Sequence, residues 1–219
     1  MAEVVSLSTI LTGAGSGIAV PFINKMLGPA ADEIGLMLGE RVRLFRLQNQ
    51  FKLFRAAQQM LTVAGIEPKQ VNLKLLLPLM EGASVEEDEV LATKWAALLA
   101  NAATHQGDML VEPSFADVLR QLTPVQAQIL DELYKQVNGA HLQDEAWGRQ
   151  TLNERQVREA LKLEFAQFER CMDNLLRLRL CAKNTPAKTT TLFSSNGYTT
   201  IEPTLFGYAF VTACKPPIK

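Results

Sequence analysis

Residues that bind metals or form disulfides are scarce in this sequence. Its 219 residues include two histidines, His105 and His141, and three cysteines, Cys171, Cys181 and Cys214. The cysteines are odd in number, form no CxxC pair and lie among apolar residues, so we expect buried thiols in a reducing compartment. Neither histidine has a partner at ligand spacing. The sequence therefore predicts no metal site.

Motifs of the common enzyme classes are also missing. There is no Gly-x-Ser-x-Gly segment for a nucleophile. Residues Thr12–Ile18 read TGAGSGI and resemble the nucleotide-binding turn of short-chain dehydrogenases. However, no tyrosine is followed four positions later by lysine, and the next predicted elements are helices rather than alternating strands. We therefore expect no catalytic residue, no cofactor and no enzymatic activity.

Charged residues are absent from Val4–Asn24. The stretch is about as long as a membrane span, but Gly13, Gly15, Gly17 and Pro21 interrupt it. These interruptions favour two short buried or interfacial helices over a span. Glu3 occupies the place of a basic leader region, so no secretory signal is expected.

An excess of one charge sign is lacking overall, since 22 Lys and Arg face 23 Asp and Glu. Binding to nucleic acid or membrane would therefore need a local patch. The pattern predicts a helix from Pro29 to Val63 that ends at Gly65. In this helix, Glu40 is the only acidic residue between positions 40 and 55. Five basic residues form its basic helix surface: Arg41, Arg43, Arg46, Lys52 and Arg55. They either solvate the edge of a bundle or dock an anionic lipid, nucleic acid or acidic partner.

The same predicted helix has apolar residues on two faces. At 100° per residue one packing stripe emerges, made of Leu44, Leu47, Phe51, Phe54 and Leu61. Val42, Phe45 and Leu53 lie on the far side, which suggests a helix held between partners and hints at self-association.

Two shorter helices follow in the predicted N-terminal domain. The first runs from Leu73 to Met80 and is closed by Gly82, and the second extends to about Ala103. Ser84 and Glu87 have the spacing of a capping box for the second helix. Residues 104–113 lack periodicity and mark the expected boundary. The predicted division is an apolar N-terminal segment at 1–29, a helical domain at 30–108 and a C-terminal domain at 109–219.

The C-terminal domain has the pattern of a winged helix. After a short helix at Ser114–Leu122, Thr123, Pro124 and Gln126 supply the cap, first-turn proline and capping-box partner of a helix that extends to Val137. Further helices are predicted from Asn153 to Leu161 and from Phe165 to Arg179. Strand character follows at 180–182, 189–193 and 198–202, with a hairpin turn at Asn196 and Gly197 and a last helix at 205–214. The expected fold is mainly α, with a small β-hairpin wing.

This winged-helix segment is locally basic, with nine Lys or Arg against five Asp or Glu between positions 149 and 188. Its candidate contacts to nucleic acid or to a protein partner are Arg155, Arg158, Arg170, Arg177, Arg179 and Lys183. The helix that would enter a DNA groove carries Glu169, Asp173 and Asn174 with only Arg170 in its first half, which is a weak basis for base reading. Both DNA binding and protein docking stay open.

Three stretches carry a resemblance to a known family: residues 31–50 (ADEIGLMLGERVRLFRLQNQ), 71–103 (VNLKLLLPLMEGASVEEDEVLATKWAALLANAA) and 112–133 (EPSFADVLRQLTPVQAQILDEL). Together they resemble the abortive infection alpha family of bacteria. The resemblance implies a role in defence against bacteriophage, in which an infected cell arrests or dies before progeny are released. It carries over no catalytic residues.

Together these patterns predict an anti-phage protein that acts by binding rather than by catalysis. A protein partner or self-association is expected, with an anionic membrane surface or DNA as alternative partners. The predicted location is the cytoplasm, with a peripheral position at the inner membrane as the alternative. The alternative function is that of a winged-helix DNA-binding regulator.

Overall fold

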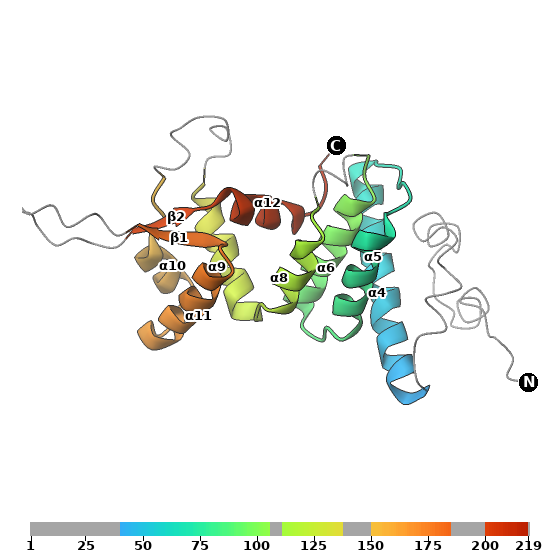
Figure 1. The fold of residues 1–219 in the computed structure, drawn as a ribbon, viewed down its shortest axis with the longest axis horizontal. Helices are drawn as coiled ribbons and strands as arrows, with labels where there is room; N and C mark the ends of the chain where they lie inside the picture. Colours follow the sequence, from blue (N-terminus) through green and yellow to red (C-terminus); the bar gives the residue numbers. More distant parts are fainter. Residues whose placement is uncertain (1–39, 106–110, 138–149, 185–199, 219) are drawn as a thin grey trace, which may run out of the picture. The chain divides into compact units, whose positions relative to one another are not determined.

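The computed structural model describes residues 40–105, 111–137, 150–184 and 200–218. Within these ranges the chain forms eight helices and one pair of antiparallel strands (Figure 1), which confirms the predicted mainly helical class. The helices and strands separate into two compact units, one containing residues up to 121 together with 213–219, the other residues 122–212. The segment Val4–Asn24, the Asn196–Gly197 turn and the predicted strand at 189–193 lie outside the described residues.

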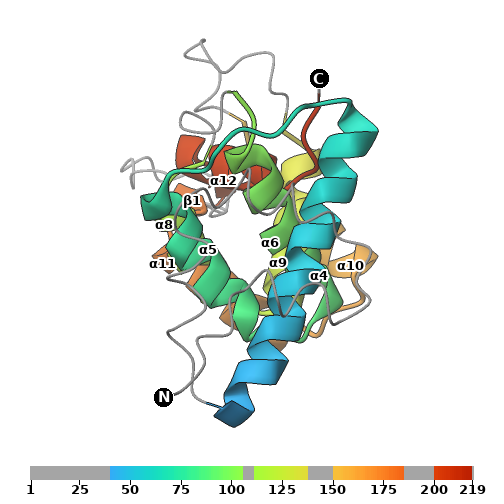
Figure 2. The same cartoon turned by 90° about the vertical axis from the view of Figure 1, so that its right-hand side faces the viewer.

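The first unit contains four helices: α4 (Glu40–Ala64), α5 (Leu73–Ser84), α6 (Glu89–Ala102) and α8 (Ser114–Arg120). Helices α4, α5 and α6 pack against one another, and α8 packs on α5 and α6 (Figure 2). The sequence grouped α8 with the C-terminal helices, whereas its packing partners are in the first unit. Gly65 ends α4 with a φ of 65°, a left-handed conformation that glycine adopts without steric cost.

Helix α4 buries a different stripe from the predicted one. Phe54 and Leu61 are buried as expected, but so is Leu53, which was assigned to the far side and is only 4% exposed. Asn49 and Gln50 are buried as well, so the stripe is rotated by roughly a quarter turn. The reason is a polar contact that hydrophobicity does not reveal, because the Asn49 amide donates hydrogen bonds to one carbonyl at the end of α5 and one in the loop that follows it.

The junction between α5 and α6 also differs from the prediction. Helix α5 continues through Gly82, and the Ser84 hydroxyl donates to the Glu81 carbonyl instead of capping α6. The α6 cap is Asp88, whose Oδ1 accepts from Val90 N at 2.9 Å and Leu91 N at 3.1 Å. The predicted Ser84–Glu87 capping box is therefore wrong, because Ser84 lies in the last turn of the preceding helix.

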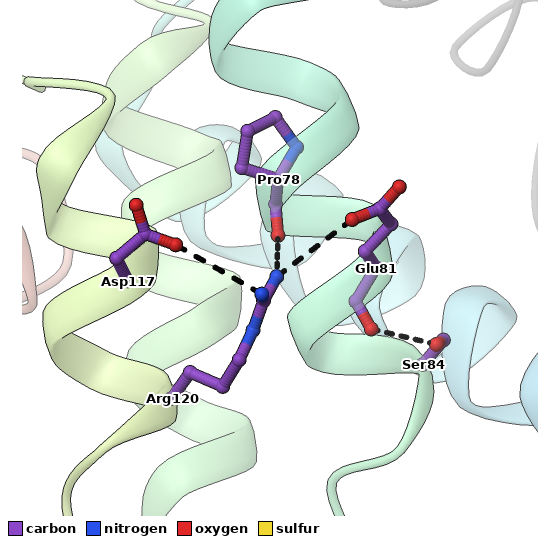
Figure 3. Close-up of polar contacts among 5 residues, drawn as sticks. All are labelled: Pro78, Glu81, Ser84, Asp117 and Arg120. Atoms are coloured by element: carbon purple, nitrogen blue, oxygen red, sulfur yellow. Dashed lines mark hydrogen bonds and ion pairs between the residues drawn. The ribbon is translucent and has the colours of Figure 1, made fainter.

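Arg120 ties α8 to α5 at the surface (Figure 3). Its guanidinium donates to the Pro78 carbonyl at 3.4 Å and lies 3.8 Å from the carboxylates of Glu81 and Asp117. Exposed ion pairs of this kind contribute little, about 0–1 kcal/mol each. The packing of α8 therefore depends mainly on its buried side chains, Phe115 and Leu119 among them.

The last residue of α12 and the residues that follow it complete the first unit. The side-chain amide of Asn101 in α6 lies 2.8 Å from the carbonyl oxygens of both Ala213 and Lys215. Asn101 is buried, so these hydrogen bonds replace the water that its amide would otherwise need. A segment more than a hundred positions away is thereby attached to α6.

The second unit contains α9 (Pro124–Lys135), α10 (Glu154–Ala160), α11 (Phe165–Arg177), β1 (Cys181–Asn184), β2 (Thr200–Pro203) and α12 (Leu205–Ala213). Two predicted caps are confirmed: Thr123 and Gln126 form the capping box of α9, and Asn153 caps α10. Strand β1 pairs antiparallel with β2, with Ala182 opposite Glu202. Leu152 N donates to Ile201 O at 2.7 Å, which adds an isolated bridge beside β2.

Tyr134 is the polar centre of the second unit. Its hydroxyl donates to the Leu180 carbonyl and accepts from Thr204 N at 3.1 Å, which connects the end of α9 to both sides of the strand pair. Burial is the main cause that raises the pKa of Tyr134 from 10.0 to about 12. Gly207 lies against this hydroxyl, because an added Cβ there would be 2.1 Å from it.

Gly82 of α5 packs directly against the Trp95 ring of α6. A Cβ at position 82 would lie 2.2 Å from Trp95 Cη2, and Trp95 is fully buried.

We expect Gly82→Ala to lower the free energy of unfolding by about 1–3 kcal/mol, despite the better helix propensity of alanine. Urea unfolding would measure this. Lys74→Ala, an exposed change in the same helix, should stay within about 0.5 kcal/mol, and equal stability of Gly82→Ala and wild type would contradict the packing.

Tyr134→Phe should remove the hydroxyl bonds and lower stability by about 1–3 kcal/mol near neutral pH. The raised pKa adds stability that is fully present below pH 10, the unfolded value, and lost as pH rises toward 12. Burial likewise raises the pKa of the Cys181 thiol from 9.0 to about 12. As the pH rises, Tyr134→Phe should therefore lose less stability than wild type, because only the Cys181 contribution is left to lose. Urea unfolding between pH 9 and 12 tests this. Identical slopes for wild type and Tyr134→Phe would refute it.

Candidate functional site

A groove of about 490 Å³ lies between α4 and the start of α6 in the first unit. Its lining is apolar along the helices and charged where α6 begins. The residues that line it are Phe45, Asn49, Lys52, Leu53, Ala56, Ala83, Glu86, Glu87, Glu89, Ala92 and Thr93. A concave site of this size with a few polar groups is typical of ligand pockets.

Asn49 and Glu86 form the fixed polar part of this α4–α6 groove. Asn49 is only 8% exposed, and its Nδ2 donates to the carbonyls of Ser84 at 3.2 Å and Glu86 at 3.1 Å. The Glu86 carboxylate accepts from Glu87 N, from Asp88 N and, at 3.3 Å, from Trp95 Nε1. Both side chains are therefore held in place by hydrogen bonds to the fold itself.

The free charges of the α4–α6 groove are mostly negative. Glu87 and Glu89 are exposed, and among the described lining residues Lys52 is the one basic side chain. Although α6 begins here, Asp88 already occupies the amides of Val90 and Leu91. The groove therefore offers an anion few donors and much repulsion. Its chemistry suits a cationic ligand.

The predicted basic helix surface is only partly described. Arg41 and Arg43 lie in α4, but their side chains are outside the description. Arg46 is half-buried, and its Nε has no hydrogen-bond partner among the described residues. Lys52 lines the α4–α6 groove beside carboxylates, while Arg55 is exposed. The three described side chains thus have three different surroundings.

The candidate contacts of the second unit lie on α10, α11 and β1, and several have partners of their own. Arg155 donates to Glu159 at 2.8 Å, a hydrogen bond that raises the pKa of Arg155 and lowers that of Glu159. Arg177 donates twice to Asn174 Oδ1. Arg170, Arg179 and Lys183 are exposed. Arg158 stacks over Phe165, with its guanidinium carbon 5.8 Å from the ring centroid.

Phe165 was not predicted as a functional residue. It is 63% exposed, while the other apolar anchors of α11, Phe168, Cys171, Met172 and Leu175, are buried. A helical wheel of α11 carries the signal, because Phe165 falls at the margin of the buried stripe rather than within it. An exposed aromatic ring capped by arginine is typical of protein interfaces.

The cysteines and the metal-binding residue types give no further site in the described residues. Cys171, Cys181 and Cys214 are buried thiols, as predicted. Across residues 40–105, 111–137, 150–184 and 200–218, no three His, Cys, Asp or Glu side chains are placed to hold a metal ion. No helix in the described part of the chain is both long and apolar enough to cross a membrane.

These features define a mainly helical protein with two compact units and a small antiparallel strand pair. The model of the abortive infection alpha family matches residues 46–214, which covers most of α4 and everything through α12. The chain belongs to this family, which confirms the resemblance seen in the sequence. Comparisons with curated proteins and with solved structures gave no match.

Proposed function

We propose that this protein acts in abortive infection by docking a protein partner on its second unit, without catalysing a reaction itself. Family membership supports the defence role. The observation that carries the docking mechanism is the exposed Phe165 ring under the Arg158 guanidinium. Burying such a ring on binding gains roughly 25 cal/mol per Å² of apolar area.

The surroundings of Phe165 support an interface with mixed polarity. The preceding loop holds half-buried Leu161 and Leu163 and exposed Lys162, and the first turn of α11 adds exposed Ala166. Apolar side chains next to basic ones fit a partner that presents an apolar surface with acidic groups at its rim.

The second candidate is binding to DNA, and the order of elements favours it. Helix α9, the Leu152 bridge, α10, α11, β1 and β2 follow one another as in a winged helix. The solvent face of α11, however, presents Arg170 and Arg177 together with Asp173. A carboxylate on this face repels phosphate, and Arg177 is engaged by Asn174, so protein docking is the better supported mechanism.

Phe165→Ala tests the docking proposal in bacteria that express the chain and are challenged with phage. We expect protection, measured as efficiency of plating, to fall at least about tenfold, the loss from removing a contact worth roughly 1.4 kcal/mol. Because Phe165 is mostly exposed, the melting temperature should hardly change. Leu205→Ala, at an apolar residue 57% exposed on α12, is the matched control and should keep protection. Full protection with Phe165→Ala would refute this docking site.

Fluorescence anisotropy with labelled duplex DNA separates the two candidates. If the second unit docks a protein, we expect no measurable binding of the duplex DNA in low salt, either by the wild-type chain or by the Arg170→Gln, Arg177→Gln double variant. DNA binding predicts an affinity that falls about tenfold or more over a severalfold rise in salt, and that the double variant weakens. The second result would replace the docking proposal.

A further inference from the structure

We propose that the α4–α6 groove binds an arginine side chain presented by a peptide of a protein partner. The site belongs to the first unit and involves none of the residues of the docking proposal. Three observations on this groove converge: the charge of its described lining, its side-chain acceptors and an exposed aromatic ring.

The charge of the groove selects a cation. Among the lining residues that the structure describes, Glu86, Glu87 and Glu89 face one lysine, Lys52, and no ion pair forms between them. Asp88 already caps α6, so the helix end adds little attraction for an anion. A ligand with positive charge would gain attraction from the carboxylates and lose little to Lys52.

The polar lining offers acceptors rather than donors. Asn49 is 8% exposed and uses its Nδ2 on two carbonyls, and no described residue donates a hydrogen bond to its Oδ1. Glu86 Oε2 accepts from Trp95 Nε1 and keeps capacity for a further donor. These side-chain oxygens are acceptors that the N–H groups of a ligand can use.

The apolar lining favours arginine over a bare ammonium ion. Phe45 is 41% exposed at the groove, and Leu53, Ala56 and Ala92 also line it. A guanidinium has five donors in a planar fork and stacks on aromatic rings, while its methylene stem suits apolar walls. The donors, planar face and stem of an arginine side chain thus fit the carboxylates, the amide oxygen and the phenyl ring of this groove.

The experiment uses the full chain labelled with ¹⁵N and two dipeptide probes. One probe is N-acetyl-leucyl-arginine amide, and the other has the uncharged isostere citrulline in place of arginine. The indole N–H of Trp95 is the reporter, because it donates to Glu86 in the groove lining. We expect the arginine probe to shift this resonance with a dissociation constant on the order of a millimolar, and the citrulline probe to bind at least about fivefold more weakly.

Variants locate the binding. Glu87→Gln with Glu89→Gln should weaken the arginine probe about fivefold or more while the fold is kept, because both residues are exposed. Phe45→Ala should weaken it as well. Glu112→Gln, an exposed carboxylate of the same unit outside the lining, is the matched control and should leave the affinity unchanged.

Three results would overturn the proposal. The first is an equal shift of the Trp95 resonance by both probes, which would mean that the apolar walls alone select the ligand. The second is an unchanged affinity of the arginine probe for the double glutamine variant. The third is the absence of a Trp95 shift at several millimolar arginine probe. Loss of plating protection by Phe165→Ala is independent of all three, so either proposal can fail alone.

Discussion

The carboxylate of Glu86 is the constraint on which the first unit depends. It lies in the short connection between α5 and α6 and accepts hydrogen bonds from two backbone amides of that connection and from the indole N–H of Trp95. Its own carbonyl, together with that of Ser84, accepts from the Asn49 amide of α4. A single residue thus fixes the course of the loop, the orientation of the buried indole and the place where α4 crosses the loop. The groove exists because these three are fixed together.

The Glu86 loop also explains why the sequence predicted this region poorly. Capping boxes are local patterns, and the Thr123–Gln126 and Asn153 caps were predictable because the groups that form them lie within three residues of one another in the sequence. At Ser84 the same pattern failed, because α5 continues to that residue and Asp88 takes over the cap. The buried face of α4 was misplaced for a related reason. Asn49 counts as a solvent residue in any hydrophobic pattern, and only the carbonyls of a distant loop make its burial favourable.

In the second unit, more of the structure could be predicted from the sequence. Its helix order, both caps and the final helix were predictable, because strong local signals separate short elements. The pairing of β1 with β2 was less accessible, since it joins strands separated by residues 185–199. Phe165 was overlooked because a phenylalanine at a helix start resembles any core residue until neighbouring elements leave it uncovered. The family match identifies a biological setting, whereas the mechanism has to be sought in such surface features.

The hydrogen bonds from Asn101 to Ala213 and Lys215 have a consequence for how the chain is made. The second unit is inserted in the sequence between α8 and these carbonyls, so α6 cannot acquire its last partners until residues 122–212 have been synthesised. Closing so long a loop is entropically unfavourable and slow compared with forming the local helices. During translation the helices around Trp95 would therefore stay incompletely packed. The first unit would become complete only after the second unit has emerged from the ribosome.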